Sequence, residues 1–254
     1  MSQSRGSVVV FDHVCKSFND KGVLQGVSLD VCEKESLVIV GRSGAGKSVL
    51  LRCALGFMRP DSGKIFVNGS VVRPAERNVS RFCDIGVVFQ SSALFDGITI
   101  WENVAFRLLN KMSRKKAMIA AIDTLLEVGM SEGVANLYPS EISGGMQRRV
   151  ALARAIVARP KILFFDEPTS GLDPIFSSMI SELIRKCIRS LGATAVTITH
   201  DISGAQIIGD SVAMLYKGKI EWIGRSSDMM NSGNAVLDQF VRGDVEGPIE
   251  QFQR

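Results

Sequence analysis

The glycine-rich stretch within residues 36–55 constrains this chain more than any other part of the sequence. An apolar, β-branched run ends at Gly41, and Gly46, Lys47 and Ser48 complete the pattern G-x-x-x-x-G-K-[ST] before an apolar helical pattern. Glycines let backbone N–H groups converge on phosphate oxygens, and a helix start adds its positive dipole end. The stretch therefore predicts a strand, a phosphate-binding loop and a helix, although an ordinary strand–turn–helix connection has the same outline. Lys47 is expected to neutralise the β- and γ-phosphates, and Ser48 to bind Mg²⁺.

Composition predicts a globular protein. The 254 residues are 46% hydrophobic and 22% charged, enough for one large α/β domain with room for a subdomain. The net charge of +4 is spread along the chain, so it is compatible with anionic ligands or lipid but does not indicate nucleic acid. No apolar run reaches the roughly 18 residues of a membrane span, and the N-terminus lacks a signal peptide pattern. We therefore expect any role at a membrane to depend on a partner.

The cysteines predict a reducing compartment. They are five in number, widely separated and without a C-x-x-C pair. The expectation is that all are reduced core residues of a cytosolic protein: Cys15, Cys32, Cys53, Cys83 and Cys187.

Three short β-branched or alternating runs predict an antiparallel β subdomain beside the glycine-rich stretch. They are residues 7–11, 26–31 and 63–67, and the Asn-Gly pair at 68–69 is a strong hairpin signal. Phe18 lies between the first two runs. The sequence leaves open whether its ring is a core or turn aromatic or stacks on a nucleotide base.

From about residue 95 to 158 the pattern becomes helical, which predicts an insertion into the α/β sheet. Residues 99–109 and 113–128 are expected to be helices, the second with Ser113 as N-cap and Gly129 as its stop. The apolar face expected for the second helix consists of Met118, Ile122, Leu125 and Leu126.

Residues 143–147, SGGMQ, precede a further helix that ends at Pro160. Unpaired N–H groups point outward at a helix start, so Ser-Gly-Gly is a second candidate phosphate site. As a bare tripeptide it is equally typical of a flexible N-cap.

Polar side chains lie where buried strands are expected to end. Gln90 follows the run IGVVF, and Asp166 and Glu167 follow the run KILFF. Ionised groups at such a position need a partner such as a metal, so we expect Asp166 to bind Mg²⁺ and Glu167 to act as general base on water. His200, after the strand at 193–199, is expected to take part in catalysis or to sense the γ-phosphate.

The rest of the chain completes an alternating α/β pattern. A helix beginning at Pro174 is expected to run to about residue 190, and residues 212–216 and 219–223 form a hairpin pattern. A last helix is expected over 234–242, and the tail beyond it has no packing signature.

Six motifs, in their order and spacing, resemble those of the ATP-binding subunits of ABC transporters over nearly the whole chain. They are the glycine-rich loop, Gln90 after a strand, SGGMQ, FFDE, SGLDP and THD. The resemblance implies a P-loop NTPase fold: a RecA-like core sheet with flanking helices, an antiparallel β subdomain and an inserted α-helical subdomain. It also implies ATP and Mg²⁺ as ligands, and ATP hydrolysis coupled to transport.

The resemblance implies a role for individual residues. Phe18 is expected to stack on adenine, Gln90 to link Mg²⁺ and water to the transport subunit, and His200 to be the switch histidine. Catalysis falls to Glu167, His200, Gln90 and Lys47, and metal binding to Ser48, Gln90 and Asp166. The nucleotide-binding set is Phe18, Gly41, Arg42, Ser43, Gly44, Ala45, Gly46, Lys47, Ser48, Val49, Gln90, Ser143, Gly144, Gly145, Gln147 and the D-loop residue Asp173.

Members of this family bind ATP between two subunits, so the resemblance implies that SGGMQ of one copy completes the glycine-rich loop of another. Ser143 and Gly145 then act in trans in a homodimer that ATP closes and hydrolysis opens. Three residues depart from the family pattern: Phe18 stands where Tyr is common, Ile142 where Leu is usual and Met146 where Gln is usual. None of the three changes removes a catalytic group.

A narrower resemblance, to the ATPases of Mla-type (MCE-associated) phospholipid transporters, rests on GRSGAGKS, QSSALFDGITIWENVAF, PSEISGGMQRR and LDQFVRGDVEGPI. It implies phospholipid transport between inner and outer membranes, maintaining outer-membrane lipid asymmetry, by a peripheral subunit on the cytoplasmic face of the inner membrane. The implied partners are a permease, a periplasmic MCE lipid-binding protein and a STAS-domain accessory protein. Residues 91–101, with Phe95, Ile98, Ile100 and Trp101, are expected beside the groove for the permease's coupling helix, or else in the core of the insertion.

Two alternatives stay open. The chain could energise an importer or exporter of another small substrate, or it could be a soluble ABC protein without a permease. Proteins of the second kind usually carry tandem domains, coiled coils or basic arms, which this sequence does not show. In each case we expect one ABC ATPase domain over 1–254, with the core at 1–94 and 159–225, the helical subdomain at 95–158 and a C-terminal helix and tail at 226–254.

Overall fold

The computed structural model describes residues 6–73 and 84–249, and the chain forms two compact units. The terminal unit comprises Met1–Arg77 and Val196–Arg254, and the central unit comprises Asn78–Ala195. Cys83, expected above to be a reduced core residue, lies outside the described residues. The prediction of an α/β protein is confirmed, because both units combine strands with helices.

An antiparallel sheet in the terminal unit has the strand order β2-β1-β4-β5. Its strands are β1 (Ser7–Phe18), β2 (Lys21–Cys32), β4 (Ser62–Val67) and β5 (Ser70–Val71). The predicted antiparallel runs are therefore present, but β1 is longer than residues 7–11. The strand continues past polar Asp12 through an irregularity in its pairing with β2, where His13 has a φ of +50°. A polar pair at a bulge thus interrupted the sequence pattern without ending the strand.

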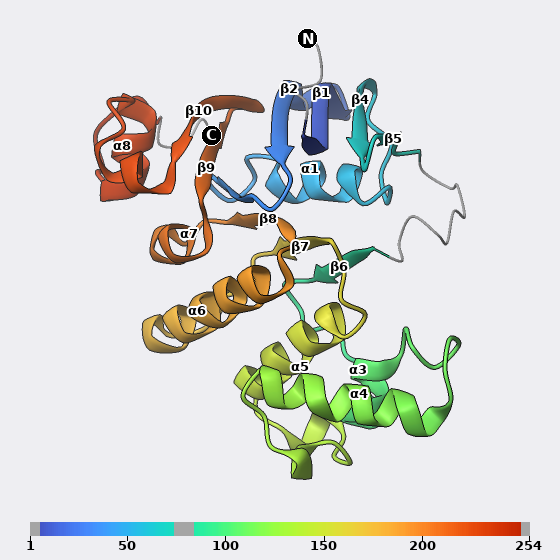
Figure 1. Ribbon diagram of the computed structural model, residues 1–254. Coiled ribbons are helices and arrows are strands. Elements are labelled where there is room, and N and C mark those ends of the chain that lie inside the picture. The colour runs from blue at the N-terminus through green and yellow to red at the C-terminus, as the bar shows by residue number, and fades with distance from the viewer. Residues whose placement is uncertain (1–5, 74–83, 250–254) are drawn as a thin grey trace. The chain divides into compact units, whose positions relative to one another are not determined.

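A second set of strands in the terminal unit follows the order β10-β9-β3-β8. They are β3 (Ser36–Val40), β9 (Ser211–Tyr216), β10 (Lys219–Arg225) and β8 (Thr194–Thr199), the last of which crosses between the units along the chain. Strand β3 pairs in parallel with β9 and is buried at every position, which explains its unbroken apolar pattern. Helix α1 (Lys47–Ala54) runs beneath the antiparallel sheet in Figure 1 and contacts β2 and β4.

The C-terminal part of the terminal unit contains α7 (Ile202–Ile208), the short 3₁₀ helix η3 (Ser226–Asn231) and α8 (Ala235–Arg242). Helix α8 contacts β10, as Figure 1 shows, and Asn234 caps it by accepting from two backbone N–H groups. On β10, the ring of Trp222 lies so close to Gly224 that a Cβ there would meet it at 2.5 Å. The sequence had predicted α8 but neither α7 nor η3.

The expectation that the tail has no packing signature is wrong as far as Ile249. The Ile249 side chain is buried, and its N–H donates to Oε1 of the buried Gln239 at 2.6 Å. The hydroxyl of Tyr216 donates to the Pro248 carbonyl at 3.2 Å. Burial of Ile249 and hydrogen bonds such as these two hold the segment, and contacts of this kind leave no periodicity in the sequence.

The central unit joins two parallel strands to a group of helices. Strands β6 (Ile85–Val88) and β7 (Ile162–Asp166) pair in parallel, and α6 (Pro174–Leu191) follows β7 along the chain. The helices α3 (Ile100–Ala105), α4 (Arg114–Glu127) and α5 (Gly144–Ile156) pack against one another, as seen in Figure 1. Two 3₁₀ turns, η1 (Glu132–Val134) and η2 (Pro139–Glu141), connect α4 to α5. In α3, Trp101 is buried beneath the guanidinium of Arg114, 4.7 Å from the ring centroid.

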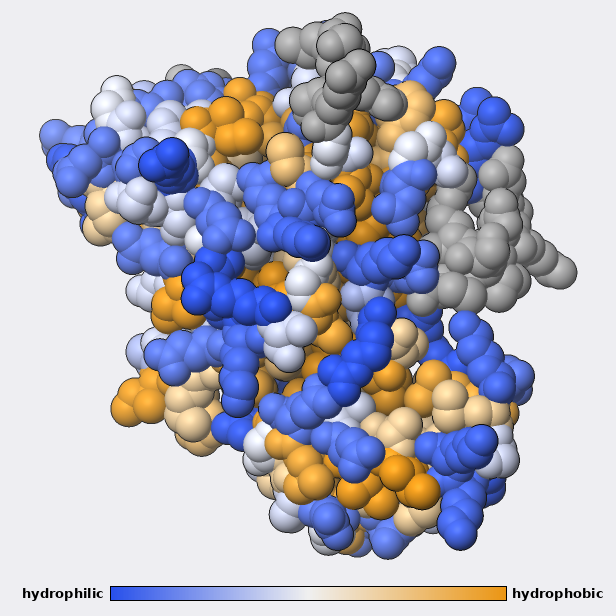
Figure 2. Space-filling view, in the orientation of Figure 1, coloured by the Kyte–Doolittle hydropathy of each residue, from blue (hydrophilic) through white to orange (hydrophobic). Residues whose placement is uncertain are grey.

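The apolar face predicted for α4 is confirmed at Leu125 and wrong at Leu126, and Met118 and Ile122 are only half-buried. The buried positions are Ala117, Ala121, Thr124 and Leu125, whereas the Leu126 side chain is 46% exposed. Small alanines let α4 approach α3 and α5 closely, so they occupy the core face although larger apolar residues were available. The displaced Leu126 lies at the surface together with Ile119, and Figure 2 shows hydrophobic residues over this part of the central unit.

Four cysteines lie among the described residues, and all four are free thiols. Only two of them are buried, although all were expected in the core. Cys53 and Cys187 are buried, and burial raises the pKa of each thiol to about 11. Cys32 is exposed because it falls on the outward side of the alternating β2 pattern, so its assignment to the core is wrong. Within residues 6–73 and 84–249, no helix is both long and apolar enough to cross a bilayer.

Candidate functional site

The predicted site residues fall into two sets, one in each unit. In the terminal unit, the loop before α1 has the shape that its glycines permit. A Cβ on Gly41 would lie 2.4 Å from the Leu215 carbonyl oxygen, and one on Gly46 would lie 3.0 Å from the Val23 carbonyl oxygen. Gly46 also has a φ of +103°, in the left-handed region that favours glycine. Both glycines are therefore required by the packing of the chain itself.

Lys47, the first residue of α1, is 5% exposed and folds back over the loop. Its Nζ donates to the Gly41 carbonyl at 2.6 Å and to the Arg42 carbonyl at 3.2 Å. No side chain caps α1, so the N–H groups of its first turn have no side-chain acceptor from the cap residue. A buried cation beside an uncapped helix start is suited to an anionic group.

The other predicted residues of the terminal unit lie around this loop or at a strand end. Ser48 and Val49 are half-buried in the first turn of α1, and Arg42, Ser43 and Gly44 are exposed on the loop, with Ala45 half-buried. Phe18 ends β1 with its ring 43% exposed, so it is not a core aromatic. His200 is exposed directly after β8, and Asp201 beside it caps α7 by accepting from the Gly204 N–H at 3.0 Å.

In the central unit, two carboxylates lie at the end of β7. Asp166 is its last residue and Glu167 follows, and both side chains are buried, with exposed fractions of 9% and 8%. Glu167 has a φ of +48°, a left-handed conformation that costs a residue with a Cβ about 1 kcal/mol or more. Such strain persists where the surrounding structure fixes the backbone, and it is concentrated at functional sites.

The structure brings Gln90 close to the turn that follows Glu167. The Gln90 side-chain amide donates to Ser170 Oγ at 3.3 Å, and the Ser170 N–H donates to the Glu167 carbonyl at 3.2 Å. The guanidinium of Arg148 contacts the same two segments, donating to the carbonyl oxygens of Gln90 and Ser170. The predicted strand-end residues Gln90 and Glu167 therefore belong to one hydrogen-bonded cluster.

The SGGMQ segment lies beside the start of α6. Ser143 caps α5 by accepting from the Met146 N–H at 3.3 Å, and Asp173 caps α6 by accepting from two N–H groups, at 3.0 and 3.1 Å. A Cβ on Gly145 would meet the Phe176 ring at an ordinary contact distance of 3.7 Å, and one on Gly144 would meet nothing within 4 Å. The glycines of this motif are therefore not required by the chain's own packing.

Gln147, predicted to bind nucleotide, makes a local contact. Its side-chain amide donates to the Pro139 carbonyl at 2.9 Å, which ties α5 to the turn before it. Its amide oxygen is an acceptor and is not used in this contact.

A comparison with protein families finds that residues 24–170 match the model described as "ABC transporter". The chain belongs to the ABC transporter family. It is 39% identical to Protein TRIGALACTOSYLDIACYLGLYCEROL 3, chloroplastic, of Arabidopsis thaliana, over 93% of this chain and 74% of that protein. It is 34% identical to the probable ribonucleotide transport ATP-binding protein mkl of Mycobacterium leprae, over 96% of this chain and 71% of that protein.

Among solved structures, this ABC ATPase is similar to a dimeric ATP-binding cassette captured in a post-hydrolysis state with ADP and Pi. The identity is 30% and the TM-score 0.76, over 86% of this chain and 98% of that one. The predictions of a P-loop NTPase fold, of ATP hydrolysis and of ATP and Mg²⁺ as ligands are confirmed by these relations. The protein is an ATP-hydrolysing subunit of an ABC transporter.

The three residues predicted to bind Mg²⁺, Ser48, Gln90 and Asp166, carry a hydroxyl, an amide and a carboxylate oxygen. These are hard oxygen donors of the kind that Mg²⁺ takes together with phosphate oxygens. In the described part of the chain, no three His, Cys, Asp or Glu side chains cluster as a metal site. When bound, Mg²⁺ neutralises charge on the β- and γ-phosphates.

Three buried or half-buried polar residues of the ABC ATPase have a structural role that the sequence motifs did not indicate. Arg148 and Arg154 bind loop carbonyls, and Asn103 is completely buried. The Asn103 side chain accepts from the Phe95 N–H at 2.7 Å and donates to the carbonyl of Phe95 at 3.0 Å and to those of Ile98 and Thr99. A polar residue inside an apolar helical run was the available signal, since burial requires such a group to be paired.

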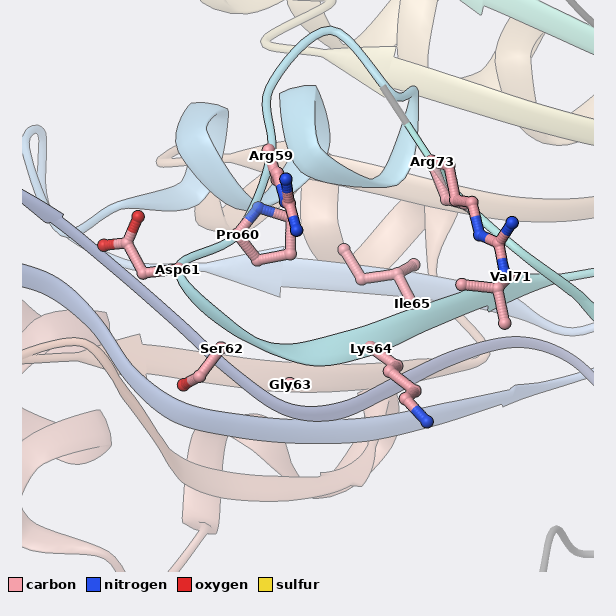
Figure 3. Close-up of a pocket in the computed structure, with 10 residues that line it drawn as sticks. Arg59, Pro60, Asp61, Ser62, Gly63, Lys64, Ile65, Val71 and Arg73 are labelled. Atoms are coloured by element: carbon pink, nitrogen blue, oxygen red, sulfur yellow. The ribbon is translucent and has the colours of Figure 1, made fainter. Parts of the chain in front are cut away.

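Figure 3 shows a pocket of about 570 Å³ in the terminal unit that holds none of the predicted site residues. Its lining includes Arg59, Lys64, Arg73 and Asp61 around the buried Ile65. Asp61 already accepts from Lys16 Nζ at 2.6 Å and from the Ser17 N–H at 2.7 Å, which lowers its pKa. The nucleotide site of this ATPase is therefore identified by its motifs and not by the size of a cavity.

Proposed function

We propose that the two sets of residues serve one ATP cycle, with the roles that the family resemblance implied. Lys47 and the uncapped start of α1 bind the phosphates, Phe18 stacks on adenine, and Ser48, Asp166 and Gln90 hold Mg²⁺. Burial of Lys47 supports its role, because its charge acts more strongly on a phosphate away from water. Exposure of the Phe18 ring supports its role, because adenine must be able to reach the ring.

Glu167 is proposed as the general base, with His200 contacting the γ-phosphate and Gln90 and Lys47 completing the catalytic set. The supporting observation is the buried carboxylate held on a strained backbone and linked through Ser170 to Gln90. Replacing it by an amide keeps the shape but removes the proton acceptor, so Glu167→Gln should lower the ATPase rate by roughly 10²- to 10⁴-fold and leave ATP binding intact. The matched control is Glu182→Gln, at an exposed position of α6. Unchanged ATP turnover in the Glu167→Gln variant overturns the assignment.

A second copy of the chain is the proposed partner at SGGMQ. Ser143, Gly144, Gly145 and Gln147, with Asp173 nearby, then complete the other copy's nucleotide site. The carrying observation is that Gly144 and Gly145 leave space that this chain does not fill. Ser143→Arg should abolish ATP-driven dimerisation while the monomer still binds ATP, which sedimentation with a fluorescent ATP analogue can measure. Dimerisation that survives the substitution contradicts the trans arrangement.

The permease is proposed to contact an apolar pocket beside segment 91–101. This pocket measures about 450 Å³, and Phe95 and Phe106 line it with ring centroids 4.7 Å apart. Both rings are about half exposed, whereas Ile100 and Trp101, which were expected at the groove, are in the core. The apolar surface offered to a permease helix therefore comes from Phe95 and from Phe106, a residue the sequence did not single out.

Phospholipid is the proposed substrate, moved between inner and outer membranes by a complex with an MCE protein and a STAS-domain protein at the cytoplasmic face of the inner membrane. Support comes from the tail motif LDQFVRGDVEGPI and from 39% identity to a relative whose name contains a galactolipid. The complete transporter in proteoliposomes should move a fluorescent phospholipid only with ATP and not with Glu167→Gln. Transport of a labelled ribonucleotide instead would favour the alternative of another small substrate, to which the mycobacterial relative's name points.

A further inference from the structure

Arg148 of α5 holds the segment after β6 through backbone carbonyls. One guanidinium nitrogen, Nη1, donates to the carbonyl of Gln90 and lies 3.4 Å from that of Phe89. The other, Nη2, donates to the Ser170 carbonyl at 3.1 Å. A single side chain therefore joins α5 to the start of segment 90–93 and to the turn after Glu167.

Arg154, on the same helix, holds the other end of that segment. It donates to the Ala93 carbonyl at 2.6 Å and to the Ser92 carbonyl at 2.9 Å, and its guanidinium lies 5.9 Å from the centroid of the Phe95 ring. Ala93 has a φ of +48°, a conformation that alanine adopts only when its surroundings fix it. The two short bonds from Arg154 supply that fixation.

Both arginines bind these loops without a carboxylate. In the described part of the chain their hydrogen-bond partners are all backbone carbonyls, and burial lowers the pKa of each guanidinium. Desolvating a cation is costly unless its donors are satisfied, and the planar fork of arginine satisfies two carbonyls at once. Six residues separate Arg148 from Arg154, which is about 9 Å along a helix, so the segment is tied at both ends.

We infer that Arg148 and Arg154 are positioning residues that fasten segment 90–93 to α5, so that this segment and the SGGMQ motif at the start of α5 move as one body. The inference rests on the proposed roles of Gln90 and Ser143. Contact of a second copy with SGGMQ then shifts Gln90 and the Phe95 region together, with no change of conformation inside the helix. The signature motif and the permease-facing segment become one rigid element of the ATPase.

The attachment of segment 90–93 to α5 can be tested without nucleotide, by amide hydrogen exchange of the full chain. Arg148→Gln/Arg154→Gln should speed exchange in residues 90–95 by about tenfold or more, because local opening then no longer has to break the three charged hydrogen bonds to the carbonyls of Gln90, Ser92 and Ala93. The single Arg154→Lys variant keeps the charge and one donor direction and should show a smaller increase. Exchange in this segment that equals wild type in both variants overturns the inference.

A second arm, in the Glu167→Gln background, tests the coupled movement. ATP should slow exchange both in residues 143–147 and in residues 90–95 of the parent. With both arginines replaced, ATP should still protect 143–147, whereas protection of 90–95 is lost. Loss of protection in both segments, or retention in both, contradicts the coupling. If the parent shows no ATP response at all, the proposed site roles fail, and the nucleotide-free arm still tests the attachment.

Arg149→Gln is the matched control, because Arg149 makes the same kind of bond from the same helix to a different place. Its Nη1 donates to the carbonyls of Val128 and Gly129 at 3.2 and 3.3 Å, at the end of α4. The control should loosen residues 127–130 and leave both the exchange and the ATP response of residues 90–95 at the parent level. An Arg149→Gln variant that uncouples the segment as strongly as the double variant assigns the effect to general loosening of α5 and overturns the inference.

Discussion

Two glycine-rich segments of this ABC ATPase precede a helix, and their glycines are present for different reasons. In the loop before α1, a side chain on Gly41 or Gly46 collides with the backbone of the same chain, at Leu215 or Val23. In the first turn of α5, a side chain on Gly144 meets nothing within 4 Å, and neither Gly144 nor Gly145 has a positive φ. The first pair is required by the fold, whereas the packing of this chain does not require the second pair.

The starts of the two helices also differ in whether a side chain caps them. Helix α1 has no side-chain cap, whereas α5 and α6 are capped by Ser143 and Asp173. The α1 start therefore lacks the stabilisation that a side-chain cap provides. The α5 start is stabilised within the chain by the Ser143 cap. Substitutions at matched positions can separate these two cases.

Gly41→Ala should have the largest effect on stability. Its Cβ would lie 2.4 Å from the Leu215 carbonyl oxygen, a backbone atom that cannot move without β9. We expect a loss of about 3 kcal/mol in the free energy of unfolding, the upper range for overpacking. Urea unfolding with and without ATP measures it, and a variant as stable as wild type would show that the loop is not held against β9.

Ser143→Ala should have an intermediate effect. The substitution removes the acceptor for the Met146 N–H and should lower the stability of the central unit by about 1 kcal/mol. The Ser131→Ala variant, at a 3₁₀ turn that lacks a side-chain cap bond, is the control and should change little. Equal losses in the two variants would mean that the cap of α5 contributes nothing specific.

Gly145→Ala should have the smallest effect on stability, with the opposite sign. Alanine in the first turn of a helix favours it by roughly 0.5–1 kcal/mol over glycine, and the new Cβ finds ordinary contact with Phe176. The ATPase rate should nevertheless fall by roughly a hundredfold, because the added methyl group would displace the nucleotide of the second copy proposed to bind at this motif. A variant that is more stable and fully active would remove the reason proposed for this glycine.

The fold was predictable where a local sequence pattern is typical of a single kind of structure. The buried strands β3 and β7, the hairpin at Asn68 and the helix stop at Gly129 all followed from local patterns. The α4 face was misjudged because alanine counts little in an apolar pattern but packs well between helices. The tail was missed because Ile249 docks through a non-local contact with Gln239, which no periodicity records.

For the candidate site, the sequence indicated the motifs but not the hydrogen bonds that link their residues. Lys47, Asp166 and Glu167 were located by their place after buried strands, and their burial agrees with that reading. The link from Gln90 through Ser170 to the turn after Glu167 joins residues 80 positions apart, so only the folded chain reveals it. The contacts of the α5 arginines could not be predicted, because binding to backbone carbonyls leaves no pattern in the sequence.

The two tryptophans have a practical consequence. Trp101 is buried under Arg114 in the central unit, and Trp222 lies on β10 in the terminal unit, so each unit contains one indole. Trp101→Phe and Trp222→Phe thus convert intrinsic fluorescence into a separate reporter for each half of the molecule. The emission maximum of either variant, followed during heating, then tells whether the halves melt together or in sequence.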